Sequence, residues 1–346
     1  MNDRTRAPVD GSRRRLALAA GLGAALAAWP AAARVRGKPV RRRASRPMMG
    51  TRVDVAVRGD DPRQLDAAIA AAYGRMGALV AMMSHYEPAS RIAAINLAAG
   101  VQPVTIEPEL MDVLLMARRM SQRSGGAFDV TIGSVGRWHF DARDPRMPEP
   151  GYIAAHLRDV DWRQLVLDQD AGTAYLQRRG MRIDPGGIAK LPILAAGLQV
   201  LKDHGIEQAL VNGGGDVVAA SGAAQRPWRV GIRDPRRPAR LLGALDVRDG
   251  FVASSGDYER FFLRDGRRYH HLLDPKTGYP ARGPRGVTLV GSDLASVNGL
   301  GAAAMVLGTA GGRELIRATP GVQALVAGSD GGLWIMPGLR ERLLPA

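Results

Sequence analysis

The stretch RIDPGGIAK, residues 182–190, sets a carboxylate, a proline, two glycines and a lysine close together, with no histidine or cysteine nearby. Glycine turns let backbone N–H groups approach a phosphate or a planar ring, because no Cβ atom stands in the way. Lys190 follows Gly186 by four residues at the start of an expected helix, where an anion is favoured. The stretch therefore predicts contact with an anionic ligand; a plain tight turn and a solvated helix lysine are the alternatives.

Two further glycine clusters lie beside acidic or hydroxyl side chains. Gly213–Gly215 precede Asp216, and Gly256 follows Ser254 and Ser255. One such turn is usually structural, whereas three in one chain favour a role in ligand binding. None has the spacing of a Walker loop or of the GxGxxG fingerprint inside a strand–helix–strand unit, so a standard ATP or NAD fold is not indicated.

The stretch YHHLLDPKTGYP, residues 269–280, is a further candidate for chemistry. His271 and Asp274 would suit a general base and its orienting partner, or Asp274 would bond its own backbone in a turn. A serine hydrolase using Ser254 or Ser255 is disfavoured, because the chain has no GxSxG elbow. A metal cage of histidine and cysteine is disfavoured too, since the six histidines are scattered and cysteine is absent.

The elements that must position these residues follow from periodicity. Residues 51–59 alternate apolar and polar side chains, which predicts a strand, and residues 62–83 have the spacing of a helix with one apolar face. Further helices are predicted from Pro108 to the Gly125–Gly126 stop, after Pro185, and over residues 294–308. Short strands are predicted within residues 161–168, 173–178, 208–222, 226–235, 240–256 and 258–275. Without a regular strand–helix alternation, the pattern favours an α+β fold with mixed or antiparallel sheets and packed helices.

The positive charge of the chain lies mainly at its N-terminus. Residues 1–46 hold 12 of the 48 Lys and Arg residues against two Asp, a net charge of +10 out of +15 for all 346 residues. The rest of the chain has few aromatic residues and no basic stripe interleaved with them, so nucleic-acid binding is disfavoured.

The N-terminal segment has the features of an export signal. A basic region that includes Arg13 and Arg14 precedes a short apolar stretch and a small-residue site near Ala33. The paired arginines, with Leu16 shortly after them, match the twin-arginine pattern. We therefore expect a signal peptide over residues 1–33, a basic linker over 34–46, and a periplasmic protein with no transmembrane helix after cleavage; an ordinary signal or an uncleaved anchor is the alternative.

The order of motifs resembles the ApbE family of flavin transferases. The blocks that carry this resemblance are MMGTRVDV, MSHYEPASRIAAIN, GAFDVTIG, RIDPGGIAK, LVNGGGDVVAASG, PWRVGIRDP, VASSGDYERFF, HHLLDPKTGYP and AAAMVLG. They run through nearly everything after residue 47. The resemblance implies one globular ApbE-like unit, related to the T-fold, over residues 47–346.

The resemblance also implies a site for FAD. His271 is the expected reactive histidine, with Asp274 and Lys190 as further catalytic residues. The family's nucleotide contacts fall on Met49, Gly50, Thr51, Tyr86, Ala127, Phe128, Asp129, Asp184, Lys190, Gly215, Asp216, Ser255, Gly256, His271 and Thr277. In this reading, an acceptor hydroxyl attacks the FMN-side phosphorus of FAD, His271 takes the proton, and AMP leaves. The acceptor would be a Thr or Ser of a periplasmic or membrane-linked flavoprotein, such as a subunit of a respiratory reductase or an ion pump.

The sequence departs from the family at the expected Mg²⁺ ligands. The resemblance places a main-chain ligand at Gly187 and side-chain ligands at positions 298 and 302, where the family has Asp and Thr but this chain has Asn298 and Ala302. Leu191 and Pro192 also stand where the family tends to have glycine and an aromatic residue. Two alternatives to an active transferase follow: an FAD carrier or assembly protein that has lost turnover, and a hydrolase that splits FAD into FMN and AMP.

Overall fold

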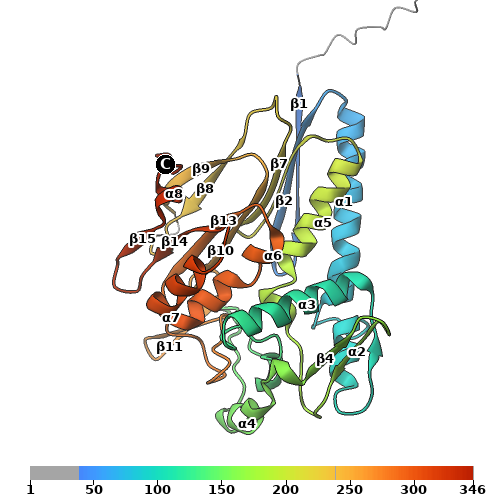
Figure 1. Ribbon diagram of the computed structural model, residues 1–346, viewed down its shortest axis with the longest axis vertical. Helices are drawn as coiled ribbons and strands as arrows, with labels where there is room; N and C mark the ends of the chain where they lie inside the picture. Colours follow the sequence, from blue (N-terminus) through green and yellow to red (C-terminus); the bar gives the residue numbers. More distant parts are fainter. Residues whose placement is uncertain (1–38, 238, 346) are drawn as a thin grey trace, which may run out of the picture. The chain divides into compact units, whose positions relative to one another are not determined.

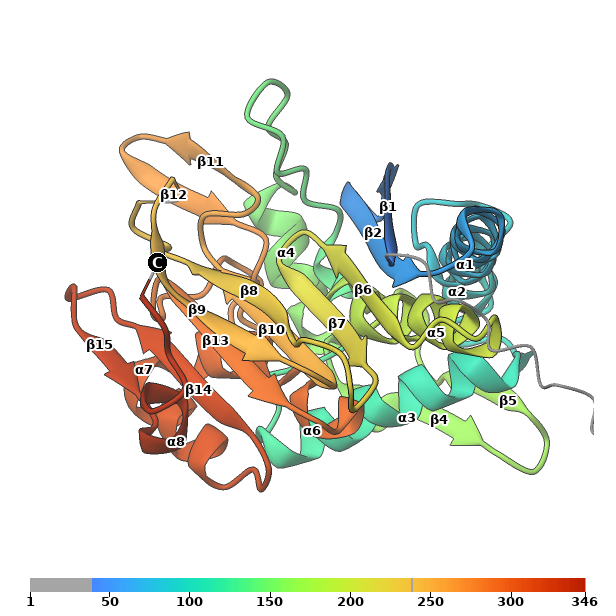
Figure 2. The same cartoon turned by 90° about the horizontal axis from the view of Figure 1, so that it is seen from above.

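The computed structural model describes residues 39–237 and 239–345, so the expected signal peptide lies outside the described residues. At the centre is an antiparallel sheet in the order β1-β2-β6-β7-β10-β13-β14-β15 (Figures 1 and 2). Its strands are β1 (Val40–Met48), β2 (Thr51–Gly59), β6 (Gln208–Gly213), β7 (Asp216–Ser221), β10 (Gly250–Gly256), β13 (Gly286–Gly291), β14 (Gln323–Ala327) and β15 (Leu333–Ile335). The fold is α+β, as the sequence predicts.

The two faces of the sheet belong to two separate cores. Along β2, Val53, Val55 and Val57 point into the larger core, whereas Ala56 between them belongs to the smaller one. The larger core also contains side chains of α1 (Pro62–Met83), α3 (Pro108–Arg123), α5 (Lys190–Asp203) and α7 (Leu300–Arg317). The smaller core lies under the ribbon of β8 (Trp228–Arg233) and β9 (Leu241–Val247) and the short helix α8 (Pro337–Arg340). Because successive side chains of a strand point to opposite faces of the sheet, one face packs against the helices and the other against the β8–β9 ribbon.

Helix α1 shows how the sequence fixes the helical layer. Asp61 caps its start by accepting a hydrogen bond from the N–H of Arg63 at 2.9 Å, and Pro62 occupies the first turn. Met76 on its buried face packs so closely on Gly197 of α5 that a methyl group there would lie 2.7 Å from the Met76 sulfur. Among the described residues, α1 is the one helix whose length and composition would allow it to cross a membrane, but its apolar face is part of the core.

The remaining elements surround this framework. A small sheet has the order β3-β5-β4, and β11 pairs with β12. The bounds are α2 (Arg91–Leu97), β3 (Val104–Thr105), α4 (Pro150–His156), β4 (Leu165–Asp168), β5 (Thr173–Leu176), β11 (Phe261–Arg264), β12 (Arg267–His270) and α6 (Leu294–Val297). Single 3₁₀ turns lie at Gly133–Val135, Leu157–Asp159, Trp162–Gln164 and Pro185–Gly187.

The predicted linker over residues 34–46 is wrong for residues 40–46, which form most of β1. This strand pairs with β2 along its whole length, from Val40 opposite Gly59 to Met48 opposite Thr51. β1 lies at the edge of the sheet, where arginines can stay in water while the backbone pairs with one neighbour. An edge strand rich in arginine therefore has the same sequence pattern as a solvated linker.

The predicted last helix over residues 294–308 is interrupted. α6 ends at Val297, Gly299 has a left-handed φ of 76°, and α7 begins at Leu300. A methyl group at Gly299 would lie 2.8 Å from Ile188 Cδ1, so both the backbone angle and the close packing require glycine. The break directs Asn298 away from the helical path.

Candidate functional site

The glycine turn between β6 and β7 brings the ends of three chain segments together. Gly214 has a φ of +63°, and a methyl group there would lie 2.6 Å from the Thr51 hydroxyl. At the same turn, Lys190 Nζ forms an ion pair with Asp216 at 2.6 Å. The other oxygen of Asp216 accepts a hydrogen bond from the N–H of Ser254 on β10 at 2.9 Å. Four predicted site blocks therefore meet at this turn.

The turn between β1 and β2 supplies Met49 and Gly50, with φ values of 55° and 67°. Met49 is one of only two described residues other than glycine with a positive φ. Such a conformation is costly for a residue with a side chain and often marks a functional position. A methyl group at Gly50 would lie 3.8 Å from a guanidinium nitrogen of Arg260, which places that cation against this turn.

Asp184 is held in place by neighbours that stabilise its charge. One of its carboxylate oxygens lies 2.9 Å from His85 Nδ1, and the same oxygen accepts a hydrogen bond from the N–H of Gly186 at 2.8 Å. Burial by itself would raise the pKa of Asp184, but His85, Gly186 and the nearby charge of Arg260 together lower it. Tyr86 follows with a side chain that is 55% exposed, beneath the guanidinium of Arg137 at 5.0 Å from the ring centre.

The charges of two cations act on His271. Burial, followed by the positive charges of Arg260 and Lys190 among smaller effects, lowers the pKa of His271 to about 3. Its ring Nδ1 lies 3.3 Å from the main-chain oxygen of Arg260. Because a carbonyl oxygen only accepts hydrogen bonds, this contact puts the ring proton on Nδ1 and leaves a lone pair on Nε2. The histidine is therefore neutral at neutral pH, with a lone pair on Nε2 that can accept a proton.

Asp274 does not orient His271, so the predicted base–carboxylate pair is wrong. Its carboxylate accepts a hydrogen bond from the N–H of Lys276 at 2.9 Å, and its main-chain oxygen accepts from Thr277 and Gly278. The Thr277 hydroxyl accepts from the N–H of Tyr279 at 3.2 Å within the same turn. The turn interpretation holds, and a catalytic role for Asp274 is limited to shaping the segment after His271.

The predicted block 127–129 reaches the site through Phe128. Its ring lies so close to Gly187 that a methyl group there would stand 3.0 Å from it. Ala127 beside it is buried. Asp129 accepts hydrogen bonds from the N–H and hydroxyl of Thr131, at 2.8 and 2.6 Å, and from the N–H of Trp162 at 3.0 Å. Both oxygens of Asp129 are thus engaged in holding the loop.

The other predicted contacts line the same region less directly. Gly215 has a φ of +97°, and its N–H donates to the Asn212 side chain at 3.1 Å. A methyl group at Gly301 of α7 would lie 2.6 Å from the Ser255 hydroxyl, which places Ser255 on the helical face of the sheet. Gly256 packs against the ring of Tyr258.

The residues at the expected metal position do not fit Mg²⁺. Asn298 directs its amide nitrogen at the main-chain oxygen of Ile188, 2.9 Å away, and Ala302 offers only carbon. In the part of the chain that the structure describes, no group of three or more His, Asp or Glu side chains could hold a metal ion. Mg²⁺ requires oxygen ligands, preferably anionic, and neither the side chain of Asn298 as it lies nor that of Ala302 supplies one.

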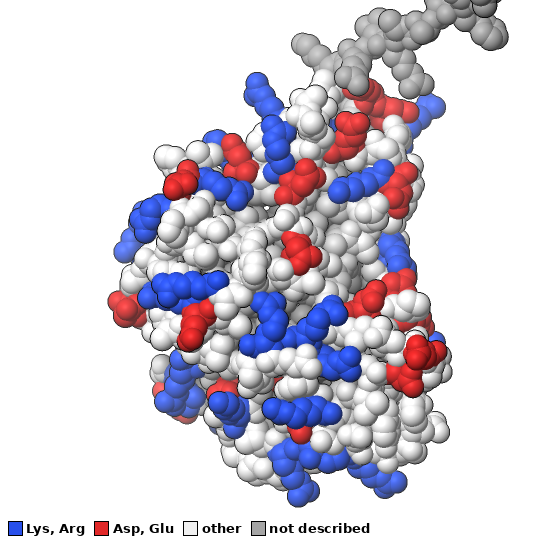
Figure 3. Space-filling view, viewed as in Figure 1, with Lys and Arg blue, Asp and Glu red and all other residues white. Residues whose placement is uncertain are grey.

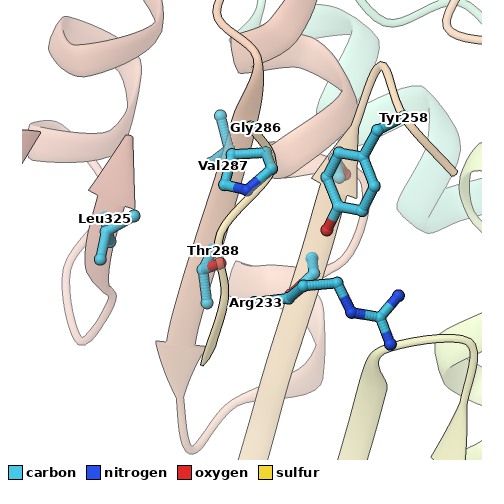
Figure 4. Close-up of a pocket in the computed structure, with 9 residues that line it drawn as sticks. Arg233, Tyr258, Gly286, Val287, Thr288 and Leu325 are labelled. Carbon is cyan, nitrogen blue, oxygen red and sulfur yellow. The ribbon is translucent and has the colours of Figure 1, made fainter. Parts of the chain in front are cut away.

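A small pocket beside β10 and β13 is too small to hold a dinucleotide. Figure 4 shows Arg233 and Tyr258 beside Thr288 at this pocket. Its volume of about 10 Å³ corresponds to one water molecule. Elsewhere, the surface shown in Figure 3 has acidic and basic side chains interspersed. The assembly around Lys190 and His271 is therefore the candidate site.

This assembly consists of the blocks that a known family shares. The model of the ApbE family matches residues 49–326. The chain belongs to the ApbE family. It is 36% identical over 274 residues to the FAD:protein FMN transferase of Treponema pallidum, a match that covers 73% of this chain and 75% of that protein. A protein of the same name from Rhodobacter capsulatus is 33% identical, over 71% of this chain and 47% of that protein.

Solved structures of ApbE proteins have the same fold. The crystal structure of the ApbE protein of Thermotoga maritima superposes with a TM-score of 0.77 and 28% identity, covering 88% of this chain and 99% of that one. The flavinyl transferase ApbE of Pseudomonas stutzeri in its apo form gives a TM-score of 0.75 at 25% identity, over 89% of this chain and 98% of that one.

Sequence reasoning missed three residues of the candidate site. His85 pairs with Asp184, Arg260 holds His271 through its carbonyl, and Arg137 donates to the main-chain oxygen of His85 at 3.2 Å. His85 and Arg260 lie inside blocks that carry the family resemblance, and this position is the one feature of the sequence that points to them. Their partners are about 100 and 11 residues away in the chain, so only the fold reveals the pairings.

Proposed function

We propose that this ApbE-family chain transfers FMN from FAD to a Ser or Thr hydroxyl of a partner flavoprotein and releases AMP. The observation that carries the proposal is the neutral His271, whose Nδ1 contacts the Arg260 carbonyl and on which the charges of Arg260 and Lys190 act. The relatives named FAD:protein FMN transferase support the same donor and reaction type. The enzyme is accordingly classed as a transferase of a phosphorus-containing group.

His271 acts as the general base in this proposal. The acceptor oxygen forms a bond to the FMN-side phosphorus while the bond from that phosphorus to the bridging oxygen breaks, and AMP departs with that oxygen. The lone pair on His271 Nε2 takes the proton of the acceptor hydroxyl. The contact of Nδ1 with the Arg260 carbonyl stabilises the imidazolium that forms, because it strengthens when the ring becomes charged.

Two cations neutralise the diphosphate in this proposal. Lys190 keeps 30% of its side chain exposed although it is paired with Asp216, so its ammonium can donate to a phosphate oxygen as well. Arg260 approaches the Met49–Gly50 turn from the His271 side, and its charge acts on both Asp184 and His271. Phosphoryl transfer depends mainly on positioning and charge neutralisation, and these groups supply both. Tyr86, half exposed beside Asp184, is suited to stack on the flavin or adenine ring.

We also propose that the protein works in the periplasm after twin-arginine export. The basic segment with Arg13 and Arg14 and the apolar stretch after it support this location. The acceptor would then be a periplasmic or membrane-linked flavoprotein, such as a subunit of a respiratory reductase or an ion pump.

The test is to incubate the mature chain with FAD and an acceptor domain that carries a Thr in an accessible loop. Transfer adds the mass of one FMN less one water to the acceptor and releases one AMP for each acceptor modified. His271→Ala is the matched inactive variant, and it should still bind FAD. AMP release with FMN left free in solution would indicate the hydrolase, and FAD binding without AMP release would indicate a carrier; either result contradicts the proposal.

A further inference from the structure

Asn298 links two segments that border the FAD site. It is 5% exposed, at the break between α6 and α7. Its amide nitrogen donates to the main-chain oxygen of Ile188 at 2.9 Å, two residues before Lys190. The opposite orientation of the amide would put two acceptor oxygens in contact, so the hydrogen bond fixes which atom faces Ile188.

The main-chain oxygen of Ile188 lies just outside α5. The cap of this helix is Ala189, whose oxygen receives the N–H of Ile193 at 3.2 Å, so the carbonyl of Ile188 before it has no donor within the helix. Among the hydrogen bonds of the described residues, Asn298 supplies the donor to this oxygen. The donor to this carbonyl therefore comes from Asn298, a position at which the chain departs from the family pattern.

The surroundings leave this hydrogen bond little freedom. Gly299 holds the break in a left-handed conformation, within close packing distance of Ile188 and Met120. The amide nitrogen also lies 3.8 Å from the Met116 sulfur, on the apolar side. A cation placed between Asn298 and Ile188 would face an N–H group in place of an oxygen, next to the apolar Ala302.

We propose that the hydrogen bond from Asn298 to Ile188 takes the place of a divalent cation at this edge of the site, so that the chain binds FAD without a metal there. The inference depends on the proposed function only because it takes FAD as the ligand. The hydrogen bond joins the α6–α7 break to the segment that carries Lys190, and a cation bound by both segments would otherwise join them. Charge neutralisation is then left to Lys190 and Arg260.

The first test measures FAD affinity of the full mature chain by fluorescence quenching, in millimolar Mg²⁺ and in EDTA. We expect the two dissociation constants to agree within about twofold, since a ligand-linked metal would change them by mass action. A dissociation constant about tenfold higher in EDTA overturns the proposal, because it shows that a cation takes part in binding.

The second test uses Asn298→Asp, which sets a carboxylate against the Ile188 carbonyl. With FAD and EDTA, we expect the melting temperature to fall by about 3–8 °C, because the buried carbonyl loses its donor and faces an anion. Millimolar Mg²⁺ should restore most of this loss, since a cation can bridge two oxygens. A variant as stable in EDTA as the parent, or one that Mg²⁺ does not rescue, overturns the proposal.

Asn96→Asp is the matched control. Asn96 likewise donates to a main-chain oxygen, that of Ile183 at 3.1 Å, at a part-buried position. This variant should lose stability without any rescue by Mg²⁺, which separates a specific bridge from a general effect of salt. If Asn298→Asp does not fold even with Mg²⁺, the FAD measurement on the parent chain decides alone. Absence of FAD binding under both conditions would refute the proposed function, whereas metal-dependent binding refutes only the inference drawn here.

Discussion

Replacing Lys190 by Met separates an observed role of this residue from a proposed one. Lys190 forms an ion pair with Asp216 at 2.6 Å, and in the proposed function its charge also acts on the diphosphate of FAD. Met has a similar length and an apolar end, so the change removes the charge and keeps most of the packing. Asp216, with 10% of its side chain exposed, would retain the hydrogen bond from Ser254 but lose its counter-ion.

The expected magnitudes differ for stability and for binding. Removing one partner of a fully buried pair costs about 3–5 kcal/mol, whereas exposed pairs are worth about 1 kcal/mol or less. Because the Lys190 side chain is 30% exposed, we expect a loss of about 1–3 kcal/mol in the free energy of unfolding. A charge-assisted hydrogen bond to phosphate contributes about 1.5–3 kcal/mol, so the FAD dissociation constant should rise about 10- to 100-fold.

The double variant Lys190→Met, Asp216→Asn makes the test sharp. The new amide side chain would still accept the hydrogen bond from Ser254 but would not be charged, so stability should recover while FAD affinity stays low. Urea unfolding gives the first quantity, and quenching of FAD fluorescence gives the second. Lys202→Met, at an exposed position near the end of the same helix, is the control for loss of a lysine. Affinity for FAD equal to that of the parent in the double variant would refute the role of Lys190 at the phosphate.

Three further predictions follow from the same site. Burial and the charge of Arg260 lower the pKa of His271 to about 3, so this residue stays neutral above that pH. The value of kcat/KM for FAD should therefore change by less than about twofold between pH 7.5 and pH 5.5. A tenfold fall over this range would instead show that His271 has an ordinary histidine pKa near 6.5. Gly214→Ala should lower the free energy of unfolding in urea by about 2–4 kcal/mol, because φ is +63° and the added methyl group meets Thr51. Gly74 lies in a helix with open space around it, so Gly74→Ala should raise the free energy of unfolding. Equal effects of the two substitutions would contradict this reasoning. Tyr86→Ala should raise the FAD dissociation constant about 2- to 10-fold, because the stacking of the ring on FAD is lost. Tyr86→Phe keeps an aromatic ring and should bind FAD as the parent does. Equal affinity of the parent and both variants would argue against stacking.

The sequence predicts the elements whose signal is local. The helix over residues 62–83 and the strand over 51–59 have the bounds that periodicity and capping residues indicate. Glycine turns are also visible, because a positive φ at Gly214 and Gly215 requires this residue type. These features depend on neighbours within a few positions, and a single sequence contains them.

Features that depend on distant partners are not visible in the sequence. β1 is a strand because β2 pairs with it, although its arginines are typical of a linker. The spacing of His271 and Asp274 suggests a pair, but the ring turns to the carbonyl of Arg260 and the carboxylate stays in its own turn. The helix break at Asn298 likewise depends on the close approach of Ile188.

The measurement that tests the account most directly is the position of FAD in a crystal structure of the His271→Ala variant soaked with FAD. We expect a diphosphate oxygen to lie within hydrogen-bond distance of Lys190 Nζ. We expect the FMN-side phosphorus to face the space left by the imidazole, near the Met49–Gly50 turn. FAD bound elsewhere, or bound here with its diphosphate directed away from both Lys190 and position 271, would contradict these expectations.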